Sequence, residues 1–312
     1  MGGLPAAAAQ RLERQRASGA TGSLLSAPAA ASVLSAGLAP AGEVFGCLVM
    51  NLGWAGGGCD WWSNNMGGFG GMGGFGAMGG WFSSPVTTSG HGGWRGFAPY
   101  VEAFETAWHG AVDRMRAEAR ALGAHGVVGV RIERSRIDGA AWEFTALGTA
   151  VRSTDPARVP FPASEGDVWC TNLSAEDTAS AILSGYLPRE IVLGMSVSTK
   201  HEDSELRQQR SIWSGNVEIS GMTELIRAAR NESRSRLVAQ ATHVGGAELV
   251  VTDMDLSEFE TQCGGQDGVD LHAESIIVGT TLVPIPGAQR RPDSGRVLTI
   301  LPLRDSEGGD RL

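Results

Sequence analysis

Two stretches of the chain decide its fold because they align without a gap: residues 25–46 read LSAPAAASVLSAGLAPAGEVFG, and residues 173–194 read LSAEDTASAILSGYLPREIVLG. Nine of the 22 aligned positions are identical, including a proline, a valine and two glycines. Composition alone does not explain such a match, so the 312-residue chain contains two copies of one structural unit.

The shared residues predict the same local structure in each copy. Ser26 and Ser174 can cap the N-terminus of a short helix by accepting a hydrogen bond from an orphan backbone N–H. Gly37 and Gly185 can adopt the left-handed conformation that ends such a helix. A β-branched, apolar stretch follows in each copy, which predicts a strand.

Each copy continues with a long helix and two strands. Apolar residues recur every three or four positions over residues 101–122 and again over residues 222–244, which indicates one buried helix face in each copy. The predicted strands are 44–52, 127–133 and 142–152 in the first copy and 191–198, 248–260 and 272–285 in the second. The predicted fold class is α+β, with one long helix packed on a three-stranded antiparallel sheet in each unit and a short capped helix before it.

This pattern divides the chain into five parts. The predicted parts are a flexible N-terminus over residues 1–22, a first domain over 23–152 with an insertion at 53–93, a proline-rich linker over 153–167, a second domain over 168–285, and a linker with an apolar segment over 286–312.

A single helix on a three-stranded sheet makes a thin structure. It leaves strand edges unpaired and one face of the sheet uncovered, and natural proteins cover, pair or close such edges. The unit is therefore expected to associate, copy with copy, chain with chain, or both.

Residues 114–152 (RMRAEARALGAHGVVGVRIERSRIDGAAWEFTALGTAVR) resemble the YbjQ-like family, whose members are also labelled heavy-metal-binding domains. The matching motifs are A-x-x-L-G-A at 119–124, V-V-G-V-R-I at 127–132 and G-T-A-V at 148–151. The segment at 185–194 is similar to the upstream part of actinobacterial members. The second copy is diverged, so the resemblance is to a tandem form of the family.

The resemblance implies a dodecin-like two-layer domain assembled into pentameric rings. The five-fold number comes only from the resemblance, and two fused copies could instead build a different or two-tiered ring. The metal-binding label of the family is tied to no set of ligands that can be transferred to residues of this chain.

The insertion is rich in glycine, methionine and aromatic residues. Residues 53–93 hold 16 glycines and a six-residue repeat that places Met66, Met72 and Met78 before Phe69, Phe75 and Trp81. Three interpretations stay open: a flexible low-complexity loop, an adhesive element between subunits, or a contact with a lipid interface. The candidate assembly residues in it are Trp54, Trp61, Trp62, Phe69, Phe75, Trp81 and Phe82.

Chemical motifs are sparse. The thioethers of Met66, Met72 and Met78, flanked by Cys59 and His91, are candidate ligands for a soft metal such as Cu(I). Gly68-x-Gly70-x-x-Gly73 matches a dinucleotide fingerprint, but no strand leads into it and no helix follows it, so no cofactor is predicted. No nucleophile elbow, zinc-protease motif or Cys/His pair with positional support is present, so no catalytic residue is predicted.

The C-terminal run 296–303 (RVLTILPL) follows a second linker. It is either an extra strand of its own domain or a docking segment that adds to an exposed strand edge of another subunit through Val297, Leu298, Ile300 and Leu301.

The net charge and the cysteine content limit the functions that the chain can have. The net charge of −9 argues against general binding to nucleic-acid phosphates, and four cysteines without a CxxC pair fit a reducing cytoplasm. We therefore expect a cytoplasmic, non-enzymatic, self-assembling scaffold or binding module. The alternatives are a protein that binds a metal or small ligand between subunits and a peripheral membrane protein that uses the glycine-rich insertion.

Overall fold

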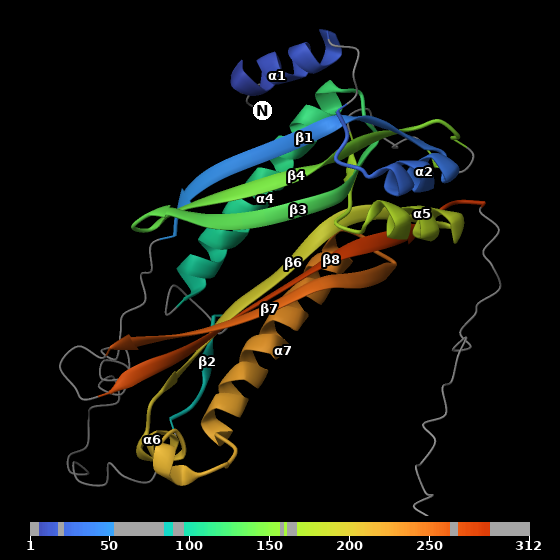
Figure 1. Ribbon diagram of the computed structural model, residues 1–312. Coiled ribbons are helices and arrows are strands. Elements are labelled where there is room, and N and C mark those ends of the chain that lie inside the picture. Colours follow the sequence, from blue (N-terminus) through green and yellow to red (C-terminus); the bar gives the residue numbers. More distant parts are fainter. Residues whose placement is uncertain are drawn as a thin grey trace, which may run out of the picture.

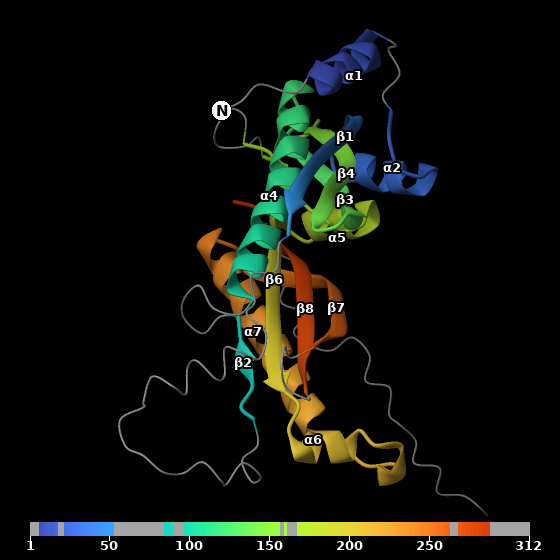
Figure 2. The same ribbon diagram turned by 90° about the vertical axis from the view of Figure 1, so that its left-hand side faces the viewer.

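A computed structural model of the chain describes residues 6–17, 22–52, 84–89, 97–156, 159–160, 167–262 and 268–287. These residues form two mainly antiparallel sheets, each with one long helix lying along it, as Figures 1 and 2 show. The predicted α+β class is confirmed.

The two units contain the same elements in the same order. The first consists of α2 (Ala27–Ser35), β1 (Leu38–Asn51), α4 (Ala98–Ala121), β3 (Gly126–Asp138) and β4 (Ala141–Ser153). The second consists of α5 (Ala175–Leu183), β6 (Tyr186–His201), α7 (Ser220–His243), β7 (Glu248–Gln262) and β8 (Val269–Pro284). In each sheet the last strand lies in the middle, in the orders β1-β4-β3 and β6-β8-β7.

One short strand extends each three-stranded sheet to four. β5 (Trp169–Cys170), which precedes α5 of the second unit, pairs in parallel with β3 of the first. β2 (Thr87–Thr88), which lies within the predicted insertion, pairs antiparallel with β6 of the second unit. The sequence prediction missed both strands because two residues carry no detectable periodicity.

The predicted helix caps are present in both units. The Ser26 hydroxyl accepts a hydrogen bond from the Ala29 N–H, and the Ser174 hydroxyl accepts one from the Asp177 N–H. Gly37 and Gly185 end the helices with φ angles of 83° and 89°. The aligned sequences therefore fold alike.

A glycine on the first strand of each unit sets the distance between helix and sheet. A Cβ atom on Gly46 would lie 2.0 Å from the Ala111 carbonyl oxygen of α4. A Cβ atom on Gly194 would lie 2.0 Å from the Ser233 carbonyl oxygen of α7. The backbone of each long helix therefore lies directly on a strand at this glycine. A larger residue at the glycine position would not allow this contact.

Part of the segment that was predicted to be flexible, residues 1–22, is helical. Residues Ala6–Ala17 form helix α1, which packs on α4. Leu12 is 2% exposed within the main core, and Arg11 forms an ion pair with the buried Glu118. The alanine-rich sequence has the helix propensity for this element, and its docking depends on a tertiary contact that a sequence pattern does not reveal.

The loop between β6 and α7 contains helix α6 (Ser204–Gln209) and a 3₁₀ turn at Ile212–Ser214. No helix among the described residues is long and apolar enough to cross a membrane.

We predict that Gly46→Ala and Gly194→Ala each lower the free energy of unfolding by about 3 kcal/mol, because the added methyl group meets helix backbone that cannot rotate away. Urea unfolding followed by circular dichroism measures the effect. Gly139→Asn is the control, since Gly139 has φ of 48° and open space around it, and asparagine tolerates this conformation. Unchanged stability of both alanine variants would contradict the close helix–strand contact.

Candidate functional site: the interface between the two units

The two units join by adding backbone from the second to a strand edge of the first. The Thr171 N–H donates to the Val127 carbonyl oxygen over 3.0 Å, and the Val130 N–H donates back to the Thr171 carbonyl oxygen over 3.0 Å. The Gly129 N–H donates to the Leu173 carbonyl oxygen over 3.1 Å. These bonds satisfy the edge of β3 where it has a register shift against β4.

Helix α5 follows this segment and packs against α2 and β3, as the adjacent short helices in Figures 1 and 2 illustrate. The side chains between them are small and apolar. The contributing residues are Ala29, Val33, Val128, Val151, Ala175, Ala179 and Ile182, none more than 7% exposed. The interface therefore has a packed apolar layer beside its hydrogen-bonded edge.

Helix α4 forms the second part of the interface by contacting β6 of the other unit as well as its own sheet. Leu193, Met195 and Val197 of β6 are at most 2% exposed and belong to the same core as Phe104 and Met115 of α4. One hydrophobic core therefore runs through both units.

An ion pair crosses this interface. Arg116 of α4 bonds to Glu190 of β6, and its Nε donates to Cys170 Sγ over 3.2 Å. Burial raises the pKa of the Glu190 carboxyl, although the guanidinium opposes this shift. Burial also raises the pKa of the Cys170 thiol to about 11, so this thiol is protonated at neutral pH and is not a ready nucleophile.

A second polar group crosses the interface nearer the far end of α4. Glu274 of β8 is 3% exposed and accepts from the Tyr100 hydroxyl over 2.8 Å and from Arg134 Nη2 over 2.5 Å. Burial raises the pKa of the Tyr100 hydroxyl, and the Glu274 carboxylate raises it further. Arg134 also stacks over the Phe104 and Trp142 rings. The buried Glu274 carboxylate of the second unit thus bonds to two side chains of the first unit.

His272 lies in the middle of an aromatic cluster beside this group. The Phe97 and Phe259 ring centres are each 4.8 Å from that of the imidazole, and Phe97 comes from the first unit. The Thr199 hydroxyl lies 2.9 Å from Nδ1, and the Thr261 hydroxyl lies 2.8 Å from Nε2. Burial lowers the pKa of His272 to about 4, so the ring is neutral at pH 7.

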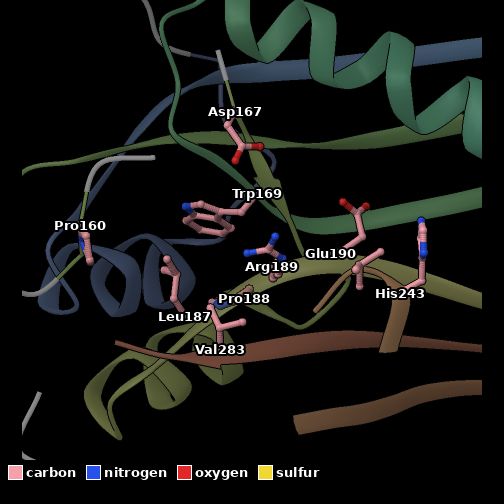
Figure 3. Close-up of a pocket in the computed structure, with 10 residues that line it drawn as sticks. Pro160, Asp167, Trp169, Leu187, Pro188, Arg189, Glu190, His243 and Val283 are labelled. Carbon is pink, nitrogen blue, oxygen red and sulfur yellow. The ribbon is translucent and has the colours of Figure 1, made fainter. Parts of the chain in front are cut away.

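A hollow of mixed polar and apolar lining opens beside the ion pair, between β5, β6 and the end of α7 (Figure 3). Its volume is about 400 Å³, and its lining includes Asp167, Trp169, Arg189, Glu190 and His243. The Trp169 indole N–H is buried and has no hydrogen-bond partner among the described residues. Both charge signs line the hollow, so its chemistry favours neither an anion nor a cation.

The site residues expected from the sequence lie outside the residues that the structure describes. The soft-metal candidates Cys59, Met66, Met72, Met78 and His91 lie outside the described residues. The same holds for the predicted assembly residues Trp54, Trp61, Trp62, Phe69, Phe75, Trp81, Phe82, Val297, Leu298, Ile300 and Leu301. Within the part of the chain that the structure describes, no group of three or more His, Cys, Asp or Glu side chains could hold a metal ion.

We predict that stability falls as the pH is lowered from 6.5 to 4. In this window the unfolded chain protonates His272, whereas the folded protein keeps it neutral, and the shift from 6.5 to about 4 corresponds to about 3 kcal/mol when complete. Urea unfolding of wild type and His272→Gln at pH 7 and pH 4.5 measures it, and the variant should lose much of the pH dependence.

His243→Gln is the matched control, because His243 is exposed at the end of α7 and this variant should follow wild type. Equal pH dependence in wild type and His272→Gln would overturn the assignment.

Comparison with known proteins bears on the first unit most directly. Residues 92–154 match the YbjQ family model, described as "Putative heavy-metal-binding". Two proteins named UPF0145 protein are similar over short stretches: that of Psychrobacter arcticus is 41% identical over 62 residues, and that of Halorubrum lacusprofundi is 49% identical over 53 residues. These matches cover 20% and 17% of this chain and 39% and 51% of the relatives.

A longer match is to the Encapsulin nanocompartment protein Rv1762c of Mycobacterium tuberculosis. The two are 32% identical over 161 residues, which are 51% of this chain and 61% of that protein. The chain thus spans between about two fifths and three fifths of the length of these relatives. Residues 92–154, which hold α4, β3 and β4, form a YbjQ-type segment, as their motifs predicted.

Proposed function

We propose that the chain is a non-enzymatic scaffold that assembles with copies of itself into a closed ring. The observation that carries this proposal is the asymmetry of the interface between the units. The first unit contributes the edge of β3, and the second contributes the segment that begins with β5, so each unit uses a different surface. Such a heterologous contact can be repeated without limit until a ring closes.

Among the described residues, the asymmetry leaves one surface of each kind unused, one in each unit. Within the described residues, β7 is the last strand of its sheet, whereas its counterpart β3 is paired with β5. An unpaired edge of this length is an association site unless something covers it. In a self-assembled ring, another copy of the same chain would cover this strand edge.

The polar groups of the interface support a structural role. Arg116, Glu190, Tyr100, Arg134 and Glu274 are engaged with one another across the two units. Burial raises the pKa of the Cys47 thiol to about 11, as it does for Cys170. A five-fold ring would follow the pentameric assembly that the YbjQ resemblance implies.

We predict that the purified full chain has a native mass that is an integral multiple, greater than one, of 32.6 kDa. Size-exclusion chromatography with multi-angle light scattering gives this mass directly, and dilution distinguishes a closed ring, which keeps its mass, from an open polymer, which shortens. A single stable 32.6 kDa species at micromolar concentration would contradict the proposal.

A second candidate function follows from the relative's name. We propose that the assembled scaffold is a component of a protein nanocompartment, because 161 residues are similar to a protein named for one. The apolar C-terminal run with Val297, Leu298, Ile300 and Leu301 follows a proline-containing linker, as a docking segment would.

Co-expression with an encapsulin shell protein tests this candidate. The full chain should co-elute with the shell, and a chain ending at residue 286 should not, while both assemble into the same number of subunits on their own. Co-elution of neither form would contradict the nanocompartment role and leave the scaffold proposal to its own test.

A further inference from the structure

We propose that residues 22–34 of a second copy of this chain occupy the edge of β7 that no described strand pairs with, and the neighbouring face of α5, in the way that residues 170–182 occupy β3 and α2 within one chain. This inference rests on the proposed self-assembly and names the two surfaces that meet. It follows from three sets of observations: the equivalence of the units, the unequal burial of equivalent residues, and a hollow at the predicted contact.

The equivalence of the two units is detailed enough to transfer a contact. Within its own unit, the Leu24 N–H donates to the Thr149 hydroxyl over 3.2 Å, and the Asn172 N–H donates to the Thr280 hydroxyl over 3.3 Å. Residues 22–25 therefore lie on their own sheet where residues 170–173 lie on theirs. What differs is that residues 170–173 also pair with another unit.

The strand that would receive them is equivalent to β3. Val128 pairs with Thr149 in the first sheet, and Val250 pairs with Thr280 in the second. Gly123 and Gly245, with φ angles of 67° and 73°, end the preceding helices in both units. Residues 126–131 of β3 thus correspond to residues 248–253 of β7 without a gap.

The donating surface is exposed in the first unit and buried in the second. Leu34 of α2 is 57% exposed, whereas the equivalent Ile182 of α5 is 2% exposed against the first unit. Ala27 and Ala31 are exposed, whereas their equivalents Ala175 and Ala179 are buried. The apolar face of α2 therefore lacks the cover that α5 has.

The receiving surface shows the converse difference. Val250 of β7 is 38% exposed, whereas the equivalent Val128 of β3 is fully buried beneath α5. Val250 and Val251 line a hollow of about 500 Å³ together with Asp177 and Ala181 of α5. In the first unit the corresponding space is filled by α5 itself.

A second strip of apolar side chains extends both surfaces. Phe45 and Val49 of β1 are 37% and 54% exposed, whereas their equivalents in β6, Leu193 and Val197, are at most 2% exposed in the core shared with α4. On α7 the outward Val238, which is 50% exposed, stands where α4 has Arg116. Helix α7 would therefore cover β1 of the second copy as α4 covers β6.

The transferred contact specifies a register. The Ser23 N–H of the second copy donates to the Leu249 carbonyl oxygen, and the Thr252 N–H donates to the Ser23 carbonyl oxygen. The Val251 N–H donates to the Leu25 carbonyl oxygen. These three bonds reproduce those that Thr171 and Leu173 make with β3.

Two charge variants test the contact because each disables one surface. Leu34→Arg blocks the donating surface, and Val250→Arg blocks the receiving surface, since burying an unpaired guanidinium is costly. Each variant alone should have the mass of a single chain by light scattering at concentrations where wild type is assembled. Mixed in equal amounts, they should form a complex of two chains, because one intact surface remains on each partner.

Control measurements distinguish loss of the proposed contact from misfolding of a variant. Ile212→Arg changes a side chain that is 89% exposed outside both surfaces, and it should assemble as wild type does. Circular dichroism and recovery of the two-chain complex show that the variants are folded. Single variants with wild-type mass, or a folded mixture that stays as single chains, would overturn the contact while self-assembly stands.

Two further outcomes also count against the contact. If a chain ending at residue 286 loses assembly while Leu34→Arg keeps it, the C-terminal segment and not residues 22–34 covers the β7 edge. If wild type itself is a single chain, both the contact and the proposed function fall.

Discussion

The unpaired edge of a strand is the constraint on which the rest of this structure depends. A long helix on three strands buries only one face of its sheet and leaves backbone donors and acceptors open at the edge. In the first unit this edge, β3, is satisfied by residues 169–173, and the same segment leads into α5, which covers Val128. One backbone contact thus determines where the second unit sits, and the apolar layer and the ion pairs at Glu190 and Glu274 follow from that placement.

Much of this fold could be predicted from the sequence, because the repeated segments contain residues that cap and terminate helices. Ser26, Gly37 and their equivalents cap and end helices through local interactions, which local sequence reveals. The site could not be predicted in the same way. Arg116 and Glu190 are 74 positions apart, and they meet where α4 packs against β6. Helix α1 likewise docks through Leu12, which is a tertiary contact, so hydrophobic periodicity in the sequence could not predict it.

The domain occurs twice in one chain. The contact between its two copies therefore shows how the domain contacts a similar neighbour. Here that contact is heterologous, and the surfaces that it uses once inside the chain recur, exposed, at Leu34 and at Val250. A scaffold built on this contact needs no catalytic group, and the similarity to a nanocompartment protein is compatible with an assembling role.

Hydrogen–deuterium exchange of the native protein tests this account most directly, because it compares equivalent backbone amides of one molecule. The amides of Gly129 and Val130 in β3 are bonded to the following unit, so they should exchange slowly. If a second copy seats on β7, then the amides of Val251 and Thr252 should be protected to a similar degree and lose that protection in Val250→Arg. Rapid exchange at Val251 and Thr252 in the wild-type protein, beside slow exchange in β3, would contradict the account.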